Sequence, residues 1–213
     1  MTPLASLTSE LTRLVGVGQP DIDRLRELKE GVPGWSELAH YITFRELLKA
    51  KPNARILVCG VYHGLDLRYL AGIAEDLGQK PTLVGVDLFS DGPCADWPVE
   101  KRGLPWMEAV GCPAPDMEAA KRNCPSAQIY KSDSVEFMQG SPFLFDVIVL
   151  DASHDEASVR AEIVAAQRIL AHGGILLGDD YVWGMGDGVK KAVEALLPHH
   201  IVLFNRIWLS QAL

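Results

Sequence analysis

Three carboxylates follow two hydrophobic segments in the C-terminal half of the sequence. Asp151 comes directly after the apolar segment 146–150, and Asp179 and Asp180 follow the segment 174–178. The intervening residues have the pattern of one amphipathic helix, so the unit predicts two parallel, neighbouring strands joined by a crossover. Neighbouring strands lie about 4.8 Å apart. The three acids should therefore meet at the carboxyl edge of a sheet, where open α/β folds bind ligands.

Acids gathered at one edge of a sheet indicate a cation. Carboxylates that lie close together repel one another unless a cation joins them, and all-oxygen ligation favours Mg²⁺, Mn²⁺ or Ca²⁺. We therefore predict a metal site formed by Asp151, Asp179 and Asp180. The alternative is that these residues only cap the next helix or turn.

Composition narrows the class of protein. The 213 residues, 48% of them hydrophobic and 23% charged, suffice for one well-buried domain with a small appendage. A net charge of −8 without a basic stripe argues against nucleic acid and favours a small-molecule partner. The sequence has neither an apolar run of about 18 residues nor a signal peptide at its start, which predicts a cytoplasmic protein without a membrane segment. The four cysteines have no CxxC spacing, so we expect reduced thiols.

The order of elements predicts an α/β fold. Residues 1–50 have a helical pattern and should form an N-terminal cap, whereas residues 51–213 alternate between strands and helices. The alternation is typical of a doubly wound, mostly parallel sheet. The predicted strands, seven in all, are residues 55–60, 82–88, 127–131, 146–150, 174–178, 201–204 and 206–209.

A proline-rich segment interrupts this alternation at about residues 90–125. It holds six of the 13 prolines together with Trp97 and Trp106. Long segments of this kind inside a compact domain are usually functional or disordered. The two tryptophans favour an ordered lid that faces the substrate. For Trp183, farther along the chain, a core position and a contact with the substrate are equally compatible with the sequence.

A glycine turn follows the first predicted strand. Gly60 and Gly64 are separated by three residues, and Tyr62 stands where a dinucleotide-binding turn would have its middle glycine. A pyrophosphate would be crowded out there. Asp87 ends the second strand and could accept hydrogen bonds from two ribose hydroxyls. The alternative is that the glycines serve only a tight turn.

These segments together resemble the ordered motifs of class I S-adenosylmethionine-dependent methyltransferases. The resemblance covers residues 55–208 and rests on residues 56–64, 86–87, 133–134, 151–154, 173–174 and 179–181. Within that class the chain is similar to the metal-dependent O-methyltransferases that act on catechol, caffeoyl-type or antibiotic-sugar hydroxyls. The resemblance implies a Rossmann-like sheet, S-adenosylmethionine as cofactor, and Mg²⁺ or another divalent cation.

The resemblance also implies roles for individual residues. His154 lies three residues after Asp151 and would take the proton of the substrate. Histidine suits this role because its unperturbed pKa lies near 6.5. The alternative is that His154 only caps the following helix. Asp151 would share in catalysis. The implied cofactor contacts are Gly60, Tyr62, Gly64, Asp87, Leu88, Asp133, Ser134 and Asp151, and the substrate contacts are Trp97, Trp106, Tyr181 and Trp183.

The chain departs from the family pattern at two positions. The family commonly has an acid two residues before the first glycine, where it contacts the methionine ammonium, and this chain has Val58 there. The catechol-type members have a lysine base where this chain has His154. Recognition of the ammonium must therefore come from elsewhere.

We accordingly expect an S-adenosylmethionine-dependent O-methyltransferase that acts on a small-molecule hydroxyl with the help of a divalent cation. A nicotinamide-dependent oxidoreductase on the same sheet, a non-catalytic nucleotide-binding module, and a branch of the methyltransferase fold with changed chemistry are the alternatives. The acceptor cannot be read from the sequence, and a homodimer is left open.

Overall fold

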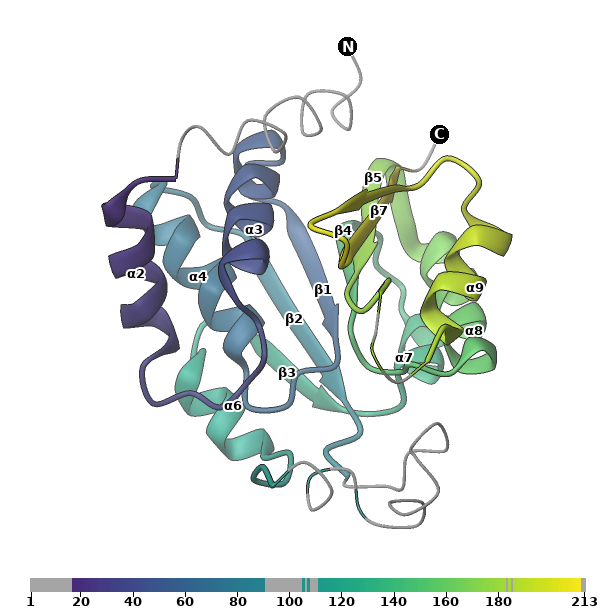
Figure 1. The fold of residues 1–213 in the computed structure, drawn as a ribbon, viewed down its shortest axis with the longest axis horizontal. Helices are drawn as coiled ribbons and strands as arrows, with labels where there is room; N and C mark the ends of the chain where they lie inside the picture. Colours follow the sequence, from purple (N-terminus) through teal and green to yellow (C-terminus); the bar gives the residue numbers. More distant parts are fainter. Residues whose placement is uncertain are drawn as a thin grey trace.

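The computed structural model describes residues 17–90, 105, 107, 111–182, 184 and 186–211. Its core is one seven-stranded sheet in the order β3-β2-β1-β4-β5-β7-β6 (Figure 1). The strands are β1 (Arg55–Cys59), β2 (Thr82–Asp87), β3 (Gln128–Lys131), β4 (Phe145–Leu150), β5 (Leu170–Gly178), β6 (Ile201–Leu203) and β7 (Ile207–Gln211). Strands β1 to β5 are parallel, and β7 runs antiparallel to both β5 and β6. The predicted doubly wound, mostly parallel sheet is confirmed.

Helices cover both faces of the sheet (Figure 1). The helices are α2 (Gln19–Lys29), α3 (Leu38–Ala50), α4 (Leu65–Asp76), α6 (Met117–Asn123), α7 (Ser134–Gly140), α8 (Glu156–Ile169) and α9 (Gly188–Leu196). One face packs against α3, α4 and α6, and the other against α7, α8 and α9. The side chains of β1 alternate accordingly, with Ile56 and Val58 in the first core and Leu57 and Cys59 in the second.

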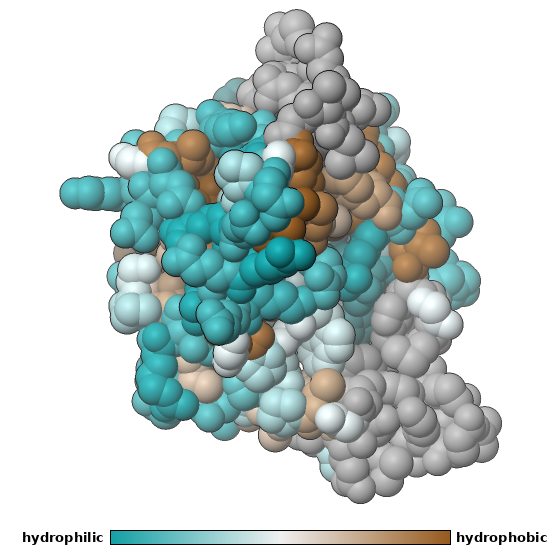
Figure 2. Space-filling view, turned by 60° about the vertical axis from the view of Figure 1, so that its left-hand side comes forward, coloured by the Kyte–Doolittle hydropathy of each residue, from teal (hydrophilic) through white to brown (hydrophobic). Residues whose placement is uncertain are grey.

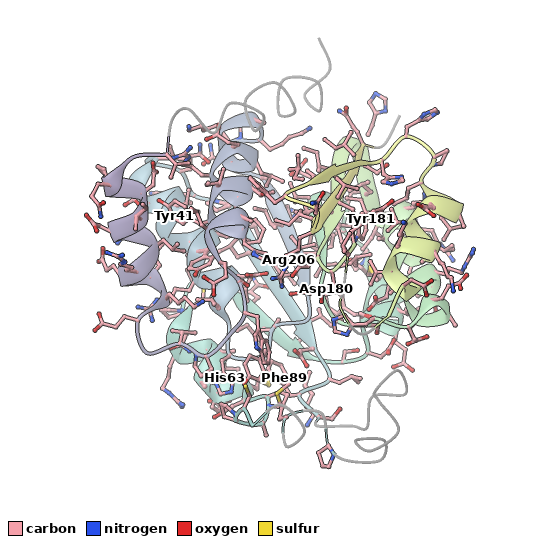
Figure 3. The ribbon with its side chains drawn as sticks, in the orientation of Figure 1. Tyr41, His63, Phe89, Asp180, Tyr181 and Arg206 are labelled. Carbon is pink, nitrogen blue, oxygen red and sulfur yellow. The ribbon has the colours of Figure 1, made fainter. Side chains whose placement is uncertain are left out.

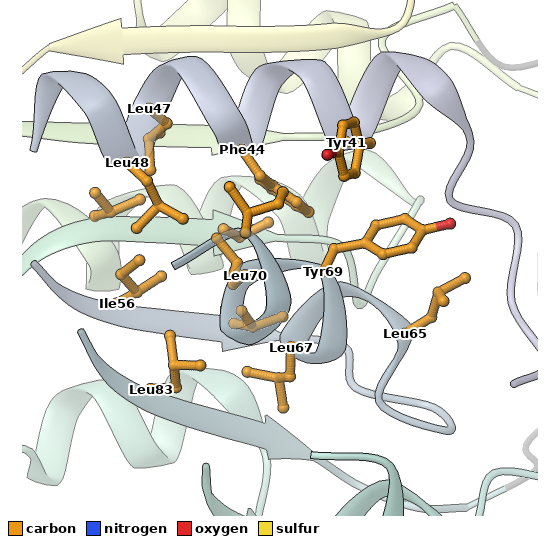
Figure 4. Packing of buried hydrophobic residues seen from close by; sticks show 14 of the residues in the cluster. Tyr41, Phe44, Leu47, Leu48, Ile56, Leu65, Leu67, Tyr69, Leu70 and Leu83 are labelled. Carbon is orange, nitrogen blue, oxygen red and sulfur yellow. The ribbon is translucent and has the colours of Figure 1, made fainter. Parts of the chain in front are cut away.

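The N-terminal helices are part of the first core. Phe44, Leu47 and Leu48 of α3 are almost fully buried and pack with Tyr69 and Leu70 of α4 (Figure 4). Helix α2 lies outside α4 and presents a mostly hydrophilic surface to solvent (Figure 2). The division into a cap of residues 1–50 and a methyltransferase domain of residues 51–213 stays a prediction.

Several sequence predictions fall outside the described residues. Trp97, Trp106 and Trp183 are among them, as is most of the first half of the predicted lid at about 90–125. The described part of that segment contains α6.

Candidate active site

A cavity of about 930 Å³ opens at the carboxyl edge of the sheet. The residues that follow β1, β2, β4 and β5 line it, and residues 33–37, between α2 and α3, close one side. The carboxyl edge of the sheet, which we predicted to bind a ligand, therefore contains a cavity. Among the predicted site residues, Gly60, Tyr62, Asp87, Leu88, Asp133, Ser134, Asp151, His154, Asp179 and Asp180 line the cavity.

The glycine turn brings the ends of β1 and β4 together. Gly60 has a φ of +90°, and a Cβ atom at that position would lie 1.9 Å from the carbonyl oxygen of Asp151. The Asp151 N–H donates to the carbonyl of Cys59 at 2.8 Å. Only glycine allows this approach, so the turn fixes the position of Asp151. Gly64, with a φ of +87°, precedes the first residue of α4.

Asp87 holds the glycine turn. Its Oδ2 accepts hydrogen bonds from the N–H groups of Val61 at 2.7 Å and Tyr62 at 2.8 Å, and its Oδ1 accepts one from Phe89 at 2.6 Å. A carboxylate offers about four acceptor positions. The protein already uses three of them. About one acceptor position remains in this arrangement, and the contact of Asp87 with two ribose hydroxyls stays a prediction.

Asp133 and Ser134 are both engaged in local structure. Asp133 caps α7, with its Oδ1 accepting from the N–H groups of Val135 and Glu136. The Ser134 hydroxyl donates to Glu162 of α8 at 2.6 Å. Burial raises the pKa of Glu162 to about 7, an effect that the Ser134 hydrogen bond partly offsets. These contacts hold in place Asp133 and Ser134, which line the cavity after the end of β3.

The predicted catalytic residues meet at the ends of β4 and β5. Asp151, His154 and Asp180 each offer a ligand atom within 4.8 Å of the others. The Nε2 atom of His154 lies 3.0 Å from Oδ2 of Asp180. Asp180 has a φ of +58°, an uncommon conformation for a residue other than glycine and one that often occurs at functional sites.

The electrostatics of Asp151 favour a cation. Burial and repulsion by Asp179, Asp66 and Asp180 raise the pKa of Asp151 well above its usual value. A divalent ion between Asp151 and Asp180 would remove this repulsion and restore the ionised carboxylate. Two carboxylates and an imidazole form a donor set that fits such an ion.

Asp179 differs from the prediction that it binds the metal. Its carboxylate accepts three hydrogen bonds from Arg206, at 2.6 to 2.8 Å. The Nε2 atom of His40 lies 3.1 Å from its Oδ2. Burial would raise the pKa of Asp179, but His40 and Arg206 hold it well below its ordinary range. Because cationic partners already neutralise Asp179, we leave it out of the metal set.

The tautomer of His40 follows from its other contact. Its Nδ1 accepts a hydrogen bond from the N–H of Glu37 at 3.1 Å, so a neutral ring carries its proton on Nε2, which faces Asp179. Burial lowers the pKa of His40, yet the contact with Asp179 and the charge of Asp66 raise it overall. Helix α3 therefore contributes directly to the charge balance of the site.

Tyr181 also differs from its prediction as a substrate contact. Its hydroxyl donates to Glu194 of α9 at 3.1 Å, and Nε2 of His200 lies 3.1 Å from the same oxygen. The ring packs against the second core and does not line the cavity. Figure 3 shows Tyr181 displaced toward α9, whereas Asp180 and Arg206 lie together at the centre. Val182 and Gly184 line the cavity instead.

Sequence reasoning missed several residues of the cavity. Arg206 comes from the turn between β6 and β7, and Asp66 from the first turn of α4. Trp35 stacks on Tyr62 with ring centroids 5.1 Å apart. No spacing signal links Arg206 or Trp35 to the strand-end acids, because the fold alone brings them there. A signal existed only for Asp66, which follows the glycine turn by two residues.

The comparisons with known proteins agree with this geometry. A family model described as "Methyltransferase domain" matches residues 57–181, more than half of the chain. A comparison with curated proteins finds no significant match. Among the described residues, no helix is long and apolar enough to cross a membrane.

Solved structures share the fold at low sequence identity. The O-methyltransferase NovP is 17% identical with a TM-score of 0.62, and the match covers 82% of this chain and 80% of NovP. CalS11, a calicheamicin methyltransferase, is 16% identical with a TM-score of 0.58, covering 98% of this chain and 91% of CalS11. Cofactor-bound Rv0187 from MTB is 17% identical with a TM-score of 0.56, covering 94% of this chain and 93% of Rv0187.

Proposed function

Because the chain belongs to the methyltransferase-domain family and is an S-adenosylmethionine-dependent methyltransferase, we propose that it methylates a hydroxyl group of a small molecule with the help of a divalent cation. The observation that carries the proposal is the grouping of Asp151, His154 and Asp180 at the carboxyl edge of the sheet. Membership in the family sets aside the nicotinamide-dependent oxidoreductase and the non-catalytic binding module.

The cofactor would occupy the part of the cavity beside the glycine turn. Gly60 and Tyr62 line this part, whereas Gly64 only precedes α4 at the end of the turn. Leu88 adds a half-exposed apolar surface, and Asp87 offers one remaining acceptor position for a ribose hydroxyl. Asp133 and Ser134 border the adenine side. S-adenosylmethionine supplies a methyl group already activated by its sulfonium charge, so orienting the acceptor oxygen contributes much of the acceleration.

His154 and Asp180 form a pair suited to remove a proton. If His154 donates its Nε2–H to Oδ2 of Asp180, its Nδ1 carries the lone pair that accepts the proton of the acceptor hydroxyl. The Asp180 carboxylate orients the ring and stabilises the imidazolium that forms. As the new O–CH₃ bond forms, the S–CH₃ bond breaks and S-adenosylhomocysteine leaves.

The candidate metal ligands are Asp151 and Asp180, with His154 within reach of the same position. A divalent ion held there would supply Lewis acidity that makes the acceptor hydroxyl easier to deprotonate. Mg²⁺ or Mn²⁺ fits the two carboxylates better than a softer metal would.

Product analysis tests the assignment to oxygen. The chain should be incubated with methyl-labelled S-adenosylmethionine and a panel of sugars and catechols, with matched amines in place of the hydroxyl groups. We expect labelled methyl ethers, identified by mass spectrometry and NMR. Methylation of amines only would overturn the proposed hydroxyl chemistry and leave the methyltransferase assignment standing.

A variant of His154 tests the proton acceptor. His154→Gln keeps much of the shape of the ring and should leave cofactor binding intact, while turnover falls by about 10² to 10⁴. Rapid-quench measurement of a single turnover should place this loss in the methyl-transfer step, because cofactor binding is unchanged. Equal single-turnover rates in the folded variant and the wild type would exclude His154 as the base.

A further inference from the structure

Strand β1 offers no acid to a bound cofactor. Val58 is fully buried in the first core, at 0% exposure, and its side chain can neither accept a hydrogen bond nor carry charge. The methionine part of S-adenosylmethionine has an ammonium group, and a cation that is removed from water when its ligand binds requires a hydrogen-bonded anionic partner. Another element must therefore supply this partner.

Asp66 meets that requirement. It is the second residue of α4, directly after the glycine turn, and it lines the cavity together with Gly60 and Leu65. The residue is 8% exposed, and its Oδ1 atom has no hydrogen-bond partner within the described part of the chain. A buried oxygen without a partner is uncommon in native proteins and requires an explanation.

The surroundings of Asp66 also favour a cationic ligand. The Ser36 hydroxyl hydrogen-bonds to the carboxyl group, while burial and the nearby Asp179 raise the pKa of Asp66 despite the opposing charge of His40. Two other acids in the cavity wall have partners, since Asp87 accepts three backbone hydrogen bonds and Asp179 is held by Arg206, and Asp151 is a ligand of the proposed divalent cation. Asp66 is a buried carboxylate beside the glycine turn, and its Oδ1 atom is available to accept a hydrogen bond from a ligand.

We propose that Asp66 binds the ammonium group of the methionine part of S-adenosylmethionine and so replaces the acid that is missing at Val58. The inference rests on the cofactor site of the proposed function. It assigns to the first turn of α4 a role in ligand recognition that β1 cannot fill in this chain.

The competing explanation is structural. A carboxylate in the first turn of a helix is stabilised by the helix dipole, and Asp66 also borders a small cavity of about 10 Å³ beside His40 and Asp179, with room for at most one water molecule. In that case Asp66 would stabilise the joint between α3 and α4 and would not distinguish ligands with an ammonium group from those without one.

Calorimetric titration of two ligands separates the explanations. One is S-adenosylhomocysteine, and the other is its deamino analogue, which lacks only the ammonium group. The wild type should bind S-adenosylhomocysteine about 10- to 100-fold more tightly than the analogue, the range expected for a charge-assisted hydrogen bond. In Asp66→Asn, which keeps the size of the side chain and a partner for Ser36, this preference should fall to within about threefold.

Glu37→Gln is the matched control. Glu37 also lines the cavity, but its side chain is 63% exposed and pairs with Lys29 at 2.5 Å. Its replacement removes the same charge and should keep the preference for the ammonium-bearing ligand. Thermal unfolding of all three proteins checks that each is folded.

The outcomes distinguish the inference from the function on which it rests. If Asp66→Asn retains the preference of the wild type, or weakens both ligands equally, Asp66 is structural and the inference is wrong. If the folded wild type binds neither ligand, the cofactor site itself is misplaced.

Discussion

At the scale of single residues, the site depends on carboxylates that look alike in the sequence and have different partners in the structure. Asp87 is held by backbone N–H groups, Asp179 by Arg206, and Asp180 by His154. Within the described part of the chain, no cationic side chain forms an ion pair with Asp151, and its pKa is raised by burial and by the acids around it. These partners decide which carboxylate remains available to a cation.

Asp87→Ala tests the double role of that residue. The variant removes the acceptor of three backbone hydrogen bonds and of one proposed ribose contact. We therefore expect the free energy of unfolding to fall by about 2 kcal/mol or more and cofactor affinity to fall at least tenfold. Urea denaturation and calorimetric titration measure the two effects.

Asp116→Ala is the control for this variant. Asp116 also accepts two backbone hydrogen bonds, as the N-cap of α6, but it does not line the cavity. The Asp116→Ala variant should lose some stability, because α6 loses its N-cap, and should keep its cofactor affinity. An unchanged affinity in folded Asp87→Ala would exclude the proposed ribose contact.

At the scale of elements, the contact between α7 and α8 encloses an ionisable group. Glu162 of α8 is 2% exposed, and its Oε1 accepts a hydrogen bond from the hydroxyl of Ser134 at the start of α7. Burial raises its pKa from an ordinary value of 4.5 to about 7. Between these two values the folded state binds more protons than the unfolded state, so the contribution of Glu162 to stability falls as pH rises through this window.

Glu162→Gln should therefore change the dependence of stability on pH. The glutamine does not ionise, so the variant avoids the cost of a buried charge at pH 8, which amounts to about 3 kcal/mol for a shift of this size. We expect the variant to gain stability relative to the wild type between pH 5 and pH 8, measured by urea denaturation. A difference that does not vary with pH would show that Glu162 is not a buried acid with a raised pKa.

The elements were more predictable than the partners of their side chains. Apolar runs, glycine turns and amphipathic spacing identified the strands that carry Asp87, Asp151 and Asp179, because these patterns arise from the burial of each element by itself. The pairing of Asp179 with Arg206 depends on the antiparallel hairpin of β6 and β7, which returns 27 residues later in the chain. Local patterns contain no information about such a contact, nor about His40, which comes from α3.

At the scale of the whole molecule, the strand order explains why one cavity gathers these groups. Strands β1 and β4 lie at the centre of the sheet, so the crossovers on either side of them leave in opposite directions and open a cavity at their carboxyl ends. The proposed cofactor residues follow β1, β2 and β3, and the proposed catalytic residues follow β4 and β5. Helix α3 and the preceding residues 33–37 complete the wall, so the N-terminal region takes part in the site.

We propose that Asp151 and Asp180 hold a divalent cation beside His154, a claim that can be measured by titration with Mn²⁺ followed by electron paramagnetic resonance. With S-adenosylhomocysteine present, we predict one bound Mn²⁺ per chain, displaced by Mg²⁺. Binding should be at least tenfold weaker in Asp180→Asn, in which asparagine tolerates the positive φ, and unchanged in Glu37→Gln. Equal Mn²⁺ binding by the wild type and Asp180→Asn, or no binding by the folded wild type, would contradict the claim.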